Sequence, residues 1–353
     1  MTEILCIGNP IVDIFIDIDK NLALKYGIKD FSQHITHEQV EAIFSEPSID
    51  FSKVERSSGG GAANVAKIAA MLGMSTVFSG CTGRDEHASV FEDEITSAGV
   101  RAELIKYDNK TGICFACNIS GGALRFAACP GAALDLTEAH ISGEMISSAE
   151  VIVLDGYILN RRSLVQHILL KASRSGIPVA LDAASVFQVK AKAEDILNLS
   201  RNFPLFIFMN ADETIAFYNT IKKVNDADSI SAKLQSMTEK EKEAFIIREI
   251  SPILKIITES DIYPILVVKL GGRGAIVFAG GHTYREETFT ITPRSTVGAG
   301  DAFCAAFISA WIRGKSLSEC AALGNKVARE ILEVPGTKIK SGKLKSFAKY
   351  LQK

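Results

Sequence analysis

Short hydrophobic runs alternate with amphipathic segments over most of the chain. Residues 3–8 form an apolar run that ends in Gly8-Asn9-Pro10, a pattern typical of a strand followed by a turn. From residue 134 onward, stretches with helical spacing separate further apolar runs, near residues 151–154, 178–182, 205–209, 265–269 and 275–279. This alternation predicts strands and helices in turn, and hence a mainly parallel, doubly wound sheet with helices on its faces.

Two other segments have the pattern of a sheet that is covered on one side only. In residues 11–19, acids at positions 13, 17 and 19 alternate with β-branched residues, so all three acids fall on one face of a strand. Residues 103–128 also alternate and contain a Gly-Gly pair, which predicts a hairpin that returns to the same sheet. We therefore expect a small β-sheet lid, residues 13–56 and 103–131, beside a large α/β domain that comprises residues 1–12, 57–102 and 132–353.

A run of three glycines precedes a helix that is rich in small residues. Gly59, Gly60 and Gly61 are followed by alanines, and Gly73 stands where a C-terminal cap is expected. Small residues let a ligand approach the backbone, and Asn64 offers both a donor and an acceptor to a polyol. Tight packing of this helix on the sheet would explain the alanines but not the asparagine among them. The run lacks the third glycine of a dinucleotide-binding fingerprint.

Near the C-terminus, Gly298-Ala299-Gly300-Asp301 leads directly into a segment with apolar residues at helical spacing. Backbone N–H groups that converge in a loop without bulky side chains form a pocket for an anion, together with the positive end of the helix. A carboxylate there is badly placed as a phosphate ligand but well placed to take a proton from a hydroxyl that attacks a phosphate. On this stretch alone, an aspartate that merely caps the helix is an equally good interpretation.

Composition narrows the class of protein. Of the 353 residues, 47% are hydrophobic and 23% are charged, and the net charge of −2 leaves no basic face for nucleic acid or an anionic membrane. The N-terminus lacks the features of a signal peptide and no apolar run is long enough to span a bilayer, so we expect a cytoplasmic protein. The seven scattered cysteines indicate reduced thiols. Cys114 and Cys117, three apart on a predicted strand, point to opposite faces and are not a chelating pair.

The motifs together resemble those of the ribokinase-like (PfkB) carbohydrate and nucleoside kinases, and they occur in order over nearly the whole chain. Residues 298–303 resemble the C-terminal signature of that family, and residues 59–64, Gly-Gly-x-x-x-Asn, resemble its N-terminal signature. The resemblance implies a three-layer α/β fold with a small β-sheet lid. It also implies that Asp301 is the catalytic base, that the amides of Gly298, Ala299 and Gly300 form the anion hole, and that Gly59, Gly60 and Asn64 contact the substrate.

The start of the chain resembles the adenosine-kinase branch of the family. The segment from Gly8 to Ile14, with an acidic strand and then Tyr26-Gly27, is similar to the start of those enzymes, in which the residue matching Asp13 holds ribose hydroxyls and Asn9 lies beside the nucleoside. By position alone, a solvated strand residue is the simpler interpretation of Asp13. The resemblance implies a nucleoside substrate, adenosine first, whereas a kinase of the ribose or fructose type is the alternative.

The resemblance also implies a nucleotide site. Asn210 and Glu213 match an Asn-x-x-Glu motif that would position Mg²⁺, largely through water, against the phosphates of ATP. A helix capping box explains the same two residues, and both interpretations can hold together. Arg125 would reach the transferring phosphate, although a lid-surface arginine is an equally good interpretation. Further implied nucleotide contacts are Gly271 and Gly274 of a Gly-x-x-Gly turn and Asn325 of a later helix.

The implied reaction is ATP-dependent phosphorylation of a primary alcohol, with closure of the lid excluding water. A sensing protein that keeps the fold without turnover is an alternative of another class, and the intact Gly-Ala-Gly-Asp argues against it. Ser295 and Val297 replace the Asp and Thr that are usual in the family, which argues against a requirement for a monovalent cation such as K⁺. Residues 219–262 carry a charge run and predict two or three surface helices, and the mixed polar lid face favours a monomer over a lid-paired homodimer.

Overall fold

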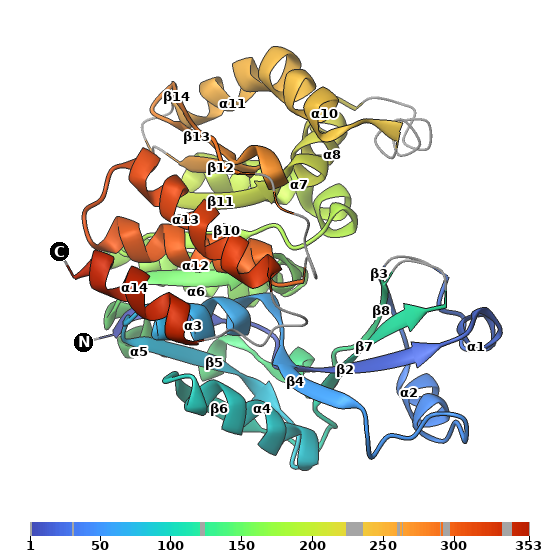
Figure 1. Cartoon of the computed structure of the whole chain (residues 1–353). Helices are drawn as coiled ribbons and strands as arrows, with labels where there is room; N and C mark the ends of the chain where they lie inside the picture. The colour runs from blue at the N-terminus through green and yellow to red at the C-terminus, as the bar shows by residue number, and fades with distance from the viewer. Residues whose placement is uncertain are drawn as a thin grey trace.

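The computed structural model describes residues 2–29, 32–120, 124–223, 236–259, 262, 264–289, 291, 297–333 and 341–352. These residues form a large sheet of nine strands and a small sheet of five. The large sheet lies between layers of helices, and the small sheet projects from one side of this body (Figure 1). The predicted α/β fold, with a mainly parallel central sheet flanked by helices and a second, smaller sheet, is confirmed.

The large sheet is parallel except at one edge. In spatial order its strands are β14 (His282–Glu286), β13 (Ala275–Ala279), β12 (Ile265–Lys269), β11 (Leu205–Asn210), β10 (Val179–Asp182), β9 (Ala149–Asp155), β1 (Thr2–Ile7), β5 (Thr76–Thr82) and β6 (Arg101–Lys106). All neighbouring strands pair in parallel except those on either side of β13, which is antiparallel to both. The apolar runs predicted as strands all lie in this sheet, because both of its faces are covered.

Helices bury the two faces of the large sheet in separate hydrophobic clusters. Cys6 and Phe208 pack on one face with Phe307, whereas Leu5 and Ile207 pack on the other. The helices of the first face are α3 (Gly61–Met71), α4 (Glu86–Ser97), α12 (Ala299–Ile312), α13 (Leu317–Leu332) and α14 (Ser341–Leu351). Those of the second are α5 (Gly143–Ser147), α6 (Arg162–Arg174), α7 (Val186–Asn202), α8 (Ala211–Ile221), α10 (Glu239–Phe245) and α11 (Ser251–Thr258). A π-helical turn, Ile246–Ile250, joins α10 to α11. Short 3₁₀ turns occur at Gly131–Asp135, Glu138–His140, Gly156–Asn160 and Gly271–Arg273.

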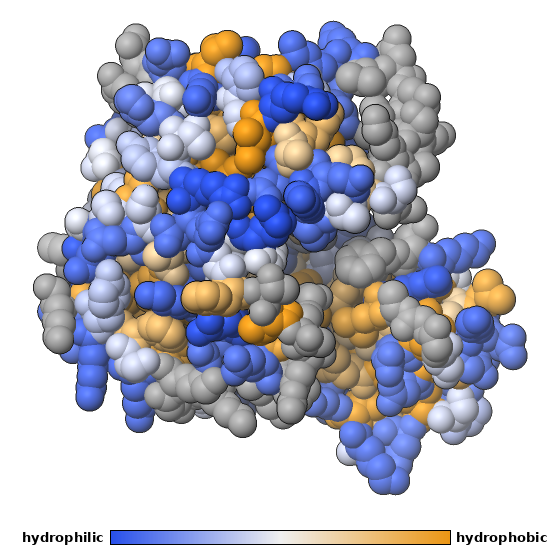
Figure 2. All heavy atoms as spheres, turned by 45° about the horizontal axis from the view of Figure 1, so that its top comes forward, coloured by the Kyte–Doolittle hydropathy of each residue, from blue (hydrophilic) through white to orange (hydrophobic). Residues whose placement is uncertain are grey.

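The small sheet is built from two separate parts of the chain. In spatial order its strands are β3 (Ser32–His34), β8 (Leu124–Cys129), β7 (Gly112–Ile119), β2 (Ile11–Ile18) and β4 (Glu55–Gly59). Two short helices, α1 (Lys20–Lys25) and α2 (His37–Phe44), lie at its end away from the body (Figure 1). Figure 2 shows that hydrophobic side chains gather on the part of the projection nearest the body. As predicted, Asp13 and Asp17 share one face of β2, but Asp19 caps α1 instead of continuing the strand.

The boundaries between the two sheets differ from the prediction. Residues 103–106, predicted in the lid, belong to β6 of the large sheet, where Val77 of β5 pairs with Arg101. Residues 57–59 and 11–12, predicted in the large domain, belong to β4 and β2 of the small sheet. The alternation that suggested a lid strand has a physical reason, since β6 is an edge strand whose side chains are mostly half-buried or exposed.

Several smaller expectations can be compared with the structure. All seven cysteines are free and buried, and Cys114 and Cys117 lie on the predicted strand, β7. The charged segment contributes α10 and α11, while residues 224–235 and Gly121-Gly122 of the predicted hairpin lie outside the described residues. In the described part of the chain, the helices are too short or too polar to cross a membrane.

The aromatic contact between β11 and α12 should contribute strongly to stability. Phe208 and Phe307 are fully buried and their rings meet edge to face at 5.4 Å. We expect Phe307→Ala to lower the free energy of unfolding by about 3–5 kcal/mol, because it leaves a cavity in the core. Phe187→Ala is the matched control, since that ring is 70% exposed. Urea unfolding followed by circular dichroism would contradict this packing if the two variants unfolded at the same midpoint.

Candidate active site

The N-terminus of α12 is an open cradle of backbone N–H groups. Its N-cap, Gly298, has φ +79°, a left-handed conformation that favours glycine, and it carries no side chain that could cap the helix. The amides of the first helical turn have no partners within the helix, so those of Ala299 and Gly300 are available to an anion. Asp301 is the third helical residue. The interpretation of Asp301 as a helix cap is therefore wrong, because the cap position belongs to Gly298.

The carboxylate of Asp301 is held by the second glycine motif instead. Asn64 of α3 donates from Nδ2 to Oδ2 of Asp301 at 2.9 Å, and the other amide atom, Oδ1, is buried without a hydrogen-bond partner among the described residues. A Cβ added at Gly61 would lie 3.5 Å from Oδ1 of Asp301. The two signatures, 237 positions apart in sequence, thus meet at one carboxylate and leave one amide oxygen to accept from a ligand.

The small sheet brings Asp13 to the same place. A Cβ at Gly59 would lie 2.3 Å from Oδ2 of Asp13, so only glycine fits beneath that carboxylate. Gly60, with φ +94°, packs equally closely on the carbonyl oxygen of Asn9. The loop that leads into α3 therefore links the predicted substrate residues Asn9, Asp13, Gly59, Gly60 and Asn64. Asp13 packs on Gly59, Asn9 packs on Gly60, and the backbone N of Asn64 donates to the carbonyl oxygen of Gly60 at 2.9 Å.

Burial perturbs both acids. Burial in the protein raises the pKa of Asp301 to about 7; Asp182 and Asp155 add to the shift, while the hydrogen bond from Asn64 and the charge of Lys269 oppose it. Burial also raises the pKa of Asp13 to about 7, against the opposing charge of Lys67. A group with a pKa near neutrality is suited to accept and release protons at physiological pH.

A buried lysine stands on the other side of the cradle. Nζ of Lys269, at the end of β12, donates to Oδ2 of Asp182 at 2.6 Å and would lie 3.1 Å from a Cβ at Gly300. Burial alone would lower the pKa of Lys269, but Asp182 and Glu213 raise it, so the ammonium stays charged. Burial raises the pKa of Glu213 to about 7, with Lys269 opposing that shift. The cradle therefore has a fixed positive charge beside its amides.

A cavity of about 430 Å³ opens next to the cradle. Four of the five residues predicted to bind nucleotide line it, namely Asn210, Gly271, Gly274 and Asn325, together with Lys269, Ala299 and Gly300. Apolar side chains that include Phe289, Phe303 and Leu332 also line it. Gly271 and Gly274 both have positive φ angles, and a Cβ at Gly274 would lie 2.0 Å from the carbonyl oxygen of Glu286. The cavity thus combines helix-start amides, a lysine and apolar side chains.

Comparison with known proteins agrees with this arrangement. The model of the pfkB family carbohydrate kinase matches residues 21–343. The chain belongs to the pfkB family. The protein is therefore a phosphotransferase.

Relatives of the pfkB family match the chain over almost its full length. An adenosine kinase from Schizophyllum commune is 24% identical over 352 residues, which cover 96% of this chain and 97% of that protein. Among solved structures, the adenosine kinase from Sinorhizobium meliloti superposes with a TM-score of 0.79 at 21% identity, covering 99% of this chain and 98% of the other. A probable sugar kinase from Rhizobium etli gives 0.80 at 21% identity, with the same coverage.

Glu213 of the pfkB-family motif does not line the cavity but supports it. Its carboxylate accepts from the backbone N and from Nδ2 of Asn210, at 2.8 and 2.7 Å, and the Asn210 side chain accepts from the amide of Glu213 in return. The capping-box interpretation is therefore confirmed. Both oxygens of Glu213 are engaged, and the described residues contain no group of three His, Cys, Asp or Glu side chains that could hold a metal. These donors fit a Mg²⁺ held mainly by phosphate and water, and they do not form a direct metal cage.

Arg125 of β8 is directed to a neighbour within the small-sheet region. Its Nη1 donates to the carbonyl oxygen of Ile28 at 2.8 Å. No described hydrogen bond joins Arg125 to Asp301 or to the residues that line the cavity. The structure thus leaves this arginine at a contact separate from those of Asp301 and of the cavity.

The structure adds residues that the motifs did not include. In parallel sheets, ligands bind at the carboxyl ends of the strands. Asn210 is the last residue of β11, and the same rule applied to β9, β10 and β12 also identifies their last residues, Asp155, Asp182 and Lys269. No sequence pattern identifies Arg161, because its link to the site is a hydrogen bond between residues far apart in sequence. Its Nη2 donates to Oδ1 of Asn9 at 2.6 Å. This bond fixes the Asn9 amide with its NH₂ group turned away from the arginine.

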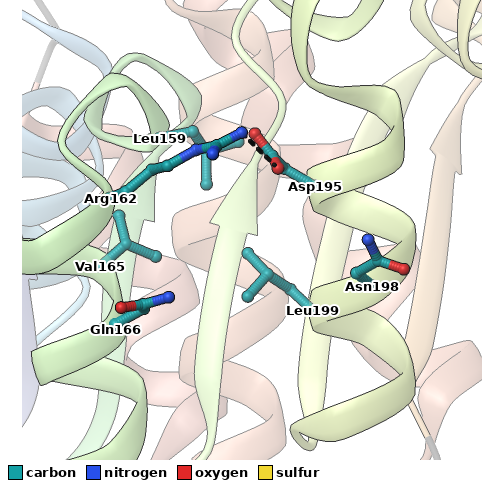
Figure 3. Close-up of a pocket in the computed structure, with 7 residues that line it drawn as sticks. All are labelled: Leu159, Arg162, Val165, Gln166, Asp195, Asn198 and Leu199. Atoms are coloured by element: carbon teal, nitrogen blue, oxygen red, sulfur yellow. Dashed lines mark hydrogen bonds and ion pairs between the residues drawn. The ribbon is translucent and has the colours of Figure 1, made fainter.

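A second hollow, of about 240 Å³, lies between α6 and α7 (Figure 3). Arg162 and Asp195 form an ion pair across it at 3.3 Å. None of the residues that line it carries a predicted role in the pfkB-family site. We therefore do not include this hollow in the candidate site.

The raised pKa of Asp301 predicts a pH-dependent cost in stability. Because the folded state binds this proton more tightly than the unfolded state, wild-type protein should lose stability as the pH rises from about 4 to about 7. Asp301→Asn removes that cost, so its stability relative to wild type should increase over the same interval. Urea unfolding at about pH 5 and about pH 8 would measure the change. Asp17→Asn, an exposed acid of β2, is the control; an equal response from both variants would contradict the assigned pKa.

Proposed function

We propose that the protein transfers the terminal phosphate of ATP to the 5′-hydroxyl of a nucleoside, with adenosine as the first candidate. The observation that carries the proposal is the hydrogen-bonded pair of Asn64 and Asp301 at the glycine-rich start of α12, beside a cavity lined by the Gly271–Gly274 turn. The Asn64–Asp301 pair offers a carboxylate that can act as a base beside the N–H groups of α12, and the cavity offers space for a nucleotide with its phosphates toward that carboxylate. Neither a helix cap nor a packing role requires this combination.

In the proposed reaction, Asp301 accepts the proton of the attacking hydroxyl while the oxygen of that hydroxyl bonds to the terminal phosphorus. The bond from that phosphorus to the bridging oxygen breaks, and ADP leaves with the electron pair. The amides of Ala299 and Gly300 stabilise the charge on the transferring group, and Lys269 neutralises phosphate charge from the side. Mg²⁺, when bound, supplies further neutralisation, and Asn210 with Glu213 would orient its water ligands.

The nucleoside is proposed from the opposite wall of the site. Asp13, held over Gly59, can accept hydrogen bonds from two neighbouring hydroxyls of a ribose, and Oδ1 of Asn64 can accept from a third. The NH₂ group of Asn9, oriented by Arg161, is free to donate. The full-length similarity to an adenosine kinase from Schizophyllum commune supports adenosine over other nucleosides.

A sugar kinase is the second candidate. The probable sugar kinase from Rhizobium etli has the same fold over nearly the whole chain, and a carboxylate at Asp13 suits a free sugar as well as a nucleoside. A panel of nucleosides and sugars assayed for ADP release separates the two candidates, and it also separates both from a binding protein without turnover.

We further propose that the protein is a monomer with Mg-ATP as its co-substrate.

Removal of the proposed base should reduce chemistry more than binding. We expect Asp301→Asn to lower kcat for adenosine by about 10²- to 10⁴-fold, the usual contribution of a general base, while the Kd of adenosine changes little. In wild type, kcat should rise with pH through an apparent pKa near 7, and this dependence should vanish in the variant. A coupled assay of ADP release together with calorimetric titration of adenosine measures both. A kcat within about tenfold of wild type would contradict the role of Asp301.

Asp13 should discriminate by ribose hydroxyls. We expect wild type to bind 2′-deoxyadenosine about 10- to 100-fold less tightly than adenosine, because a buried carboxylate loses one hydrogen-bond donor. Asp13→Asn should weaken adenosine binding by a similar factor and largely abolish the difference between the two nucleosides. Calorimetric titrations give the Kd of both nucleosides for wild type and for Asp13→Asn, with Asp17→Asn as the control. Undiminished discrimination in Asp13→Asn would show that the hydroxyls bind elsewhere.

A further inference from the structure

The charged helix α10 lies against the Gly271–Gly274 turn, which lines the proposed nucleotide cavity. Figure 1 shows α10 beside α8, toward the edge of the large sheet that carries the Gly271–Gly274 turn. A Cβ at Gly271 would lie 3.9 Å from Oε2 of Glu239, the first residue of α10. A charge run of this kind is usually a solvated helix face. Here, however, two of its charged residues are buried, and both face elements that border the cavity.

Glu243 links the Gly271–Gly274 turn to β14. Its side chain is only 4% exposed, and its carboxylate forms ion pairs with Arg273 of the turn and Arg285 of β14. The turn packs tightly on the same strand, because Gly274 leaves no space for a Cβ against the carbonyl of Glu286. Asn325, which lines the cavity, donates to that carbonyl at 3.4 Å. Glu243 therefore fixes a junction at which three walls of the cavity meet.

Lys242 makes the corresponding link to the other side of the cavity. Its side chain is 10% exposed, and Nζ lies 2.8 Å from Oδ1 of Asp212 in α8 and 3.1 Å from Oε1 of Glu239. Asp212 lies between Asn210, which lines the cavity, and Glu213, which orients Asn210. One turn of α10 is thus bonded both to the α8 N-terminus and to the glycine turn.

We propose that α10 is a positioning element for the nucleotide, in which Glu243 and Lys242 hold the glycine turn and the start of α8 at the spacing that the phosphates require. The inference rests on the proposed function for the identity of the ligand. Neither side chain lines the cavity, so both act through the groups that they hold. Their loss should weaken nucleotide binding and leave the nucleoside site, built on Asp13 and Asn64, unchanged.

The test is a comparison of ADP and adenosine affinities in three variants of the full chain. Glu243→Gln keeps the size of the side chain but removes the charge that joins two arginines, and Lys242→Gln breaks the link to α8. Glu249→Gln is the matched control, because Glu249 lies two turns away and pairs with Arg248 on the surface. Calorimetric titration with ADP and Mg²⁺, and separately with adenosine, needs no turnover, and steady-state assays then give KM for each substrate.

We expect Glu243→Gln and Lys242→Gln to raise the Kd of ADP by about 2- to 30-fold while the Kd of adenosine and that of the control stay at the wild-type values. Should Glu243→Gln fail to fold, Lys242→Gln decides the question. Wild-type ADP affinity in the folded variants, or equal losses for ADP and adenosine, would overturn the inference. A wild type that binds ADP but phosphorylates neither nucleosides nor sugars would overturn the proposed function and leave this result standing.

Discussion

The site depends on one hydrogen bond between the N-termini of two helices. Asn64 at the start of α3 donates to Asp301 at the start of α12; the Asn64 side chain is buried and Asp301 is half-buried. Burial makes the ionised form of Asp301 unfavourable, and the nearby Asp155 and Asp182 make it more so. The amide of Asn64 and the charge of Lys269 offset only part of that cost. What remains is a carboxylate held ready to take up a proton near neutral pH, as a general base requires.

The two lysines around this carboxylate both have hydrogen-bond partners. Lys269 is paired with Asp182, and Lys67 donates to the backbone oxygen and the hydroxyl of Ser58 at 2.6 and 2.8 Å. Such pairing is necessary because an isolated buried charge would cost several kcal/mol. Oδ1 of Asn64 is among the polar side-chain atoms that remain without a partner in the described residues, and the α12 amides have no partner within the helix, so both could serve a phosphate or an alcohol.

The fold and most of the site could be predicted from the sequence because short-range patterns encode them. Apolar runs mark buried strands, and glycines mark places where the backbone lies close to another group, as at Gly59 beneath Asp13, or has a positive φ, as at Gly298. Prediction failed where the same local pattern serves two purposes. The edge strand β6 alternates like a lid strand, and only its pairing with β5 separates the two cases. Nor could the sequence show that Arg161 supports Asn9, since that contact joins residues 152 positions apart.

The way in which the chain crosses between the sheets has a mechanical consequence. It passes from one sheet to the other at residues 8–10, 59–61, 107–111 and 129–131, between strands of known position. Two of these four crossings contain Asn9 and Gly59, which lies under Asp13, so half of the connections between the sheets include proposed substrate contacts. Any rotation of the small sheet about these connections would turn those contacts with it. A nucleoside held as proposed would therefore couple its own binding to the angle between the sheets.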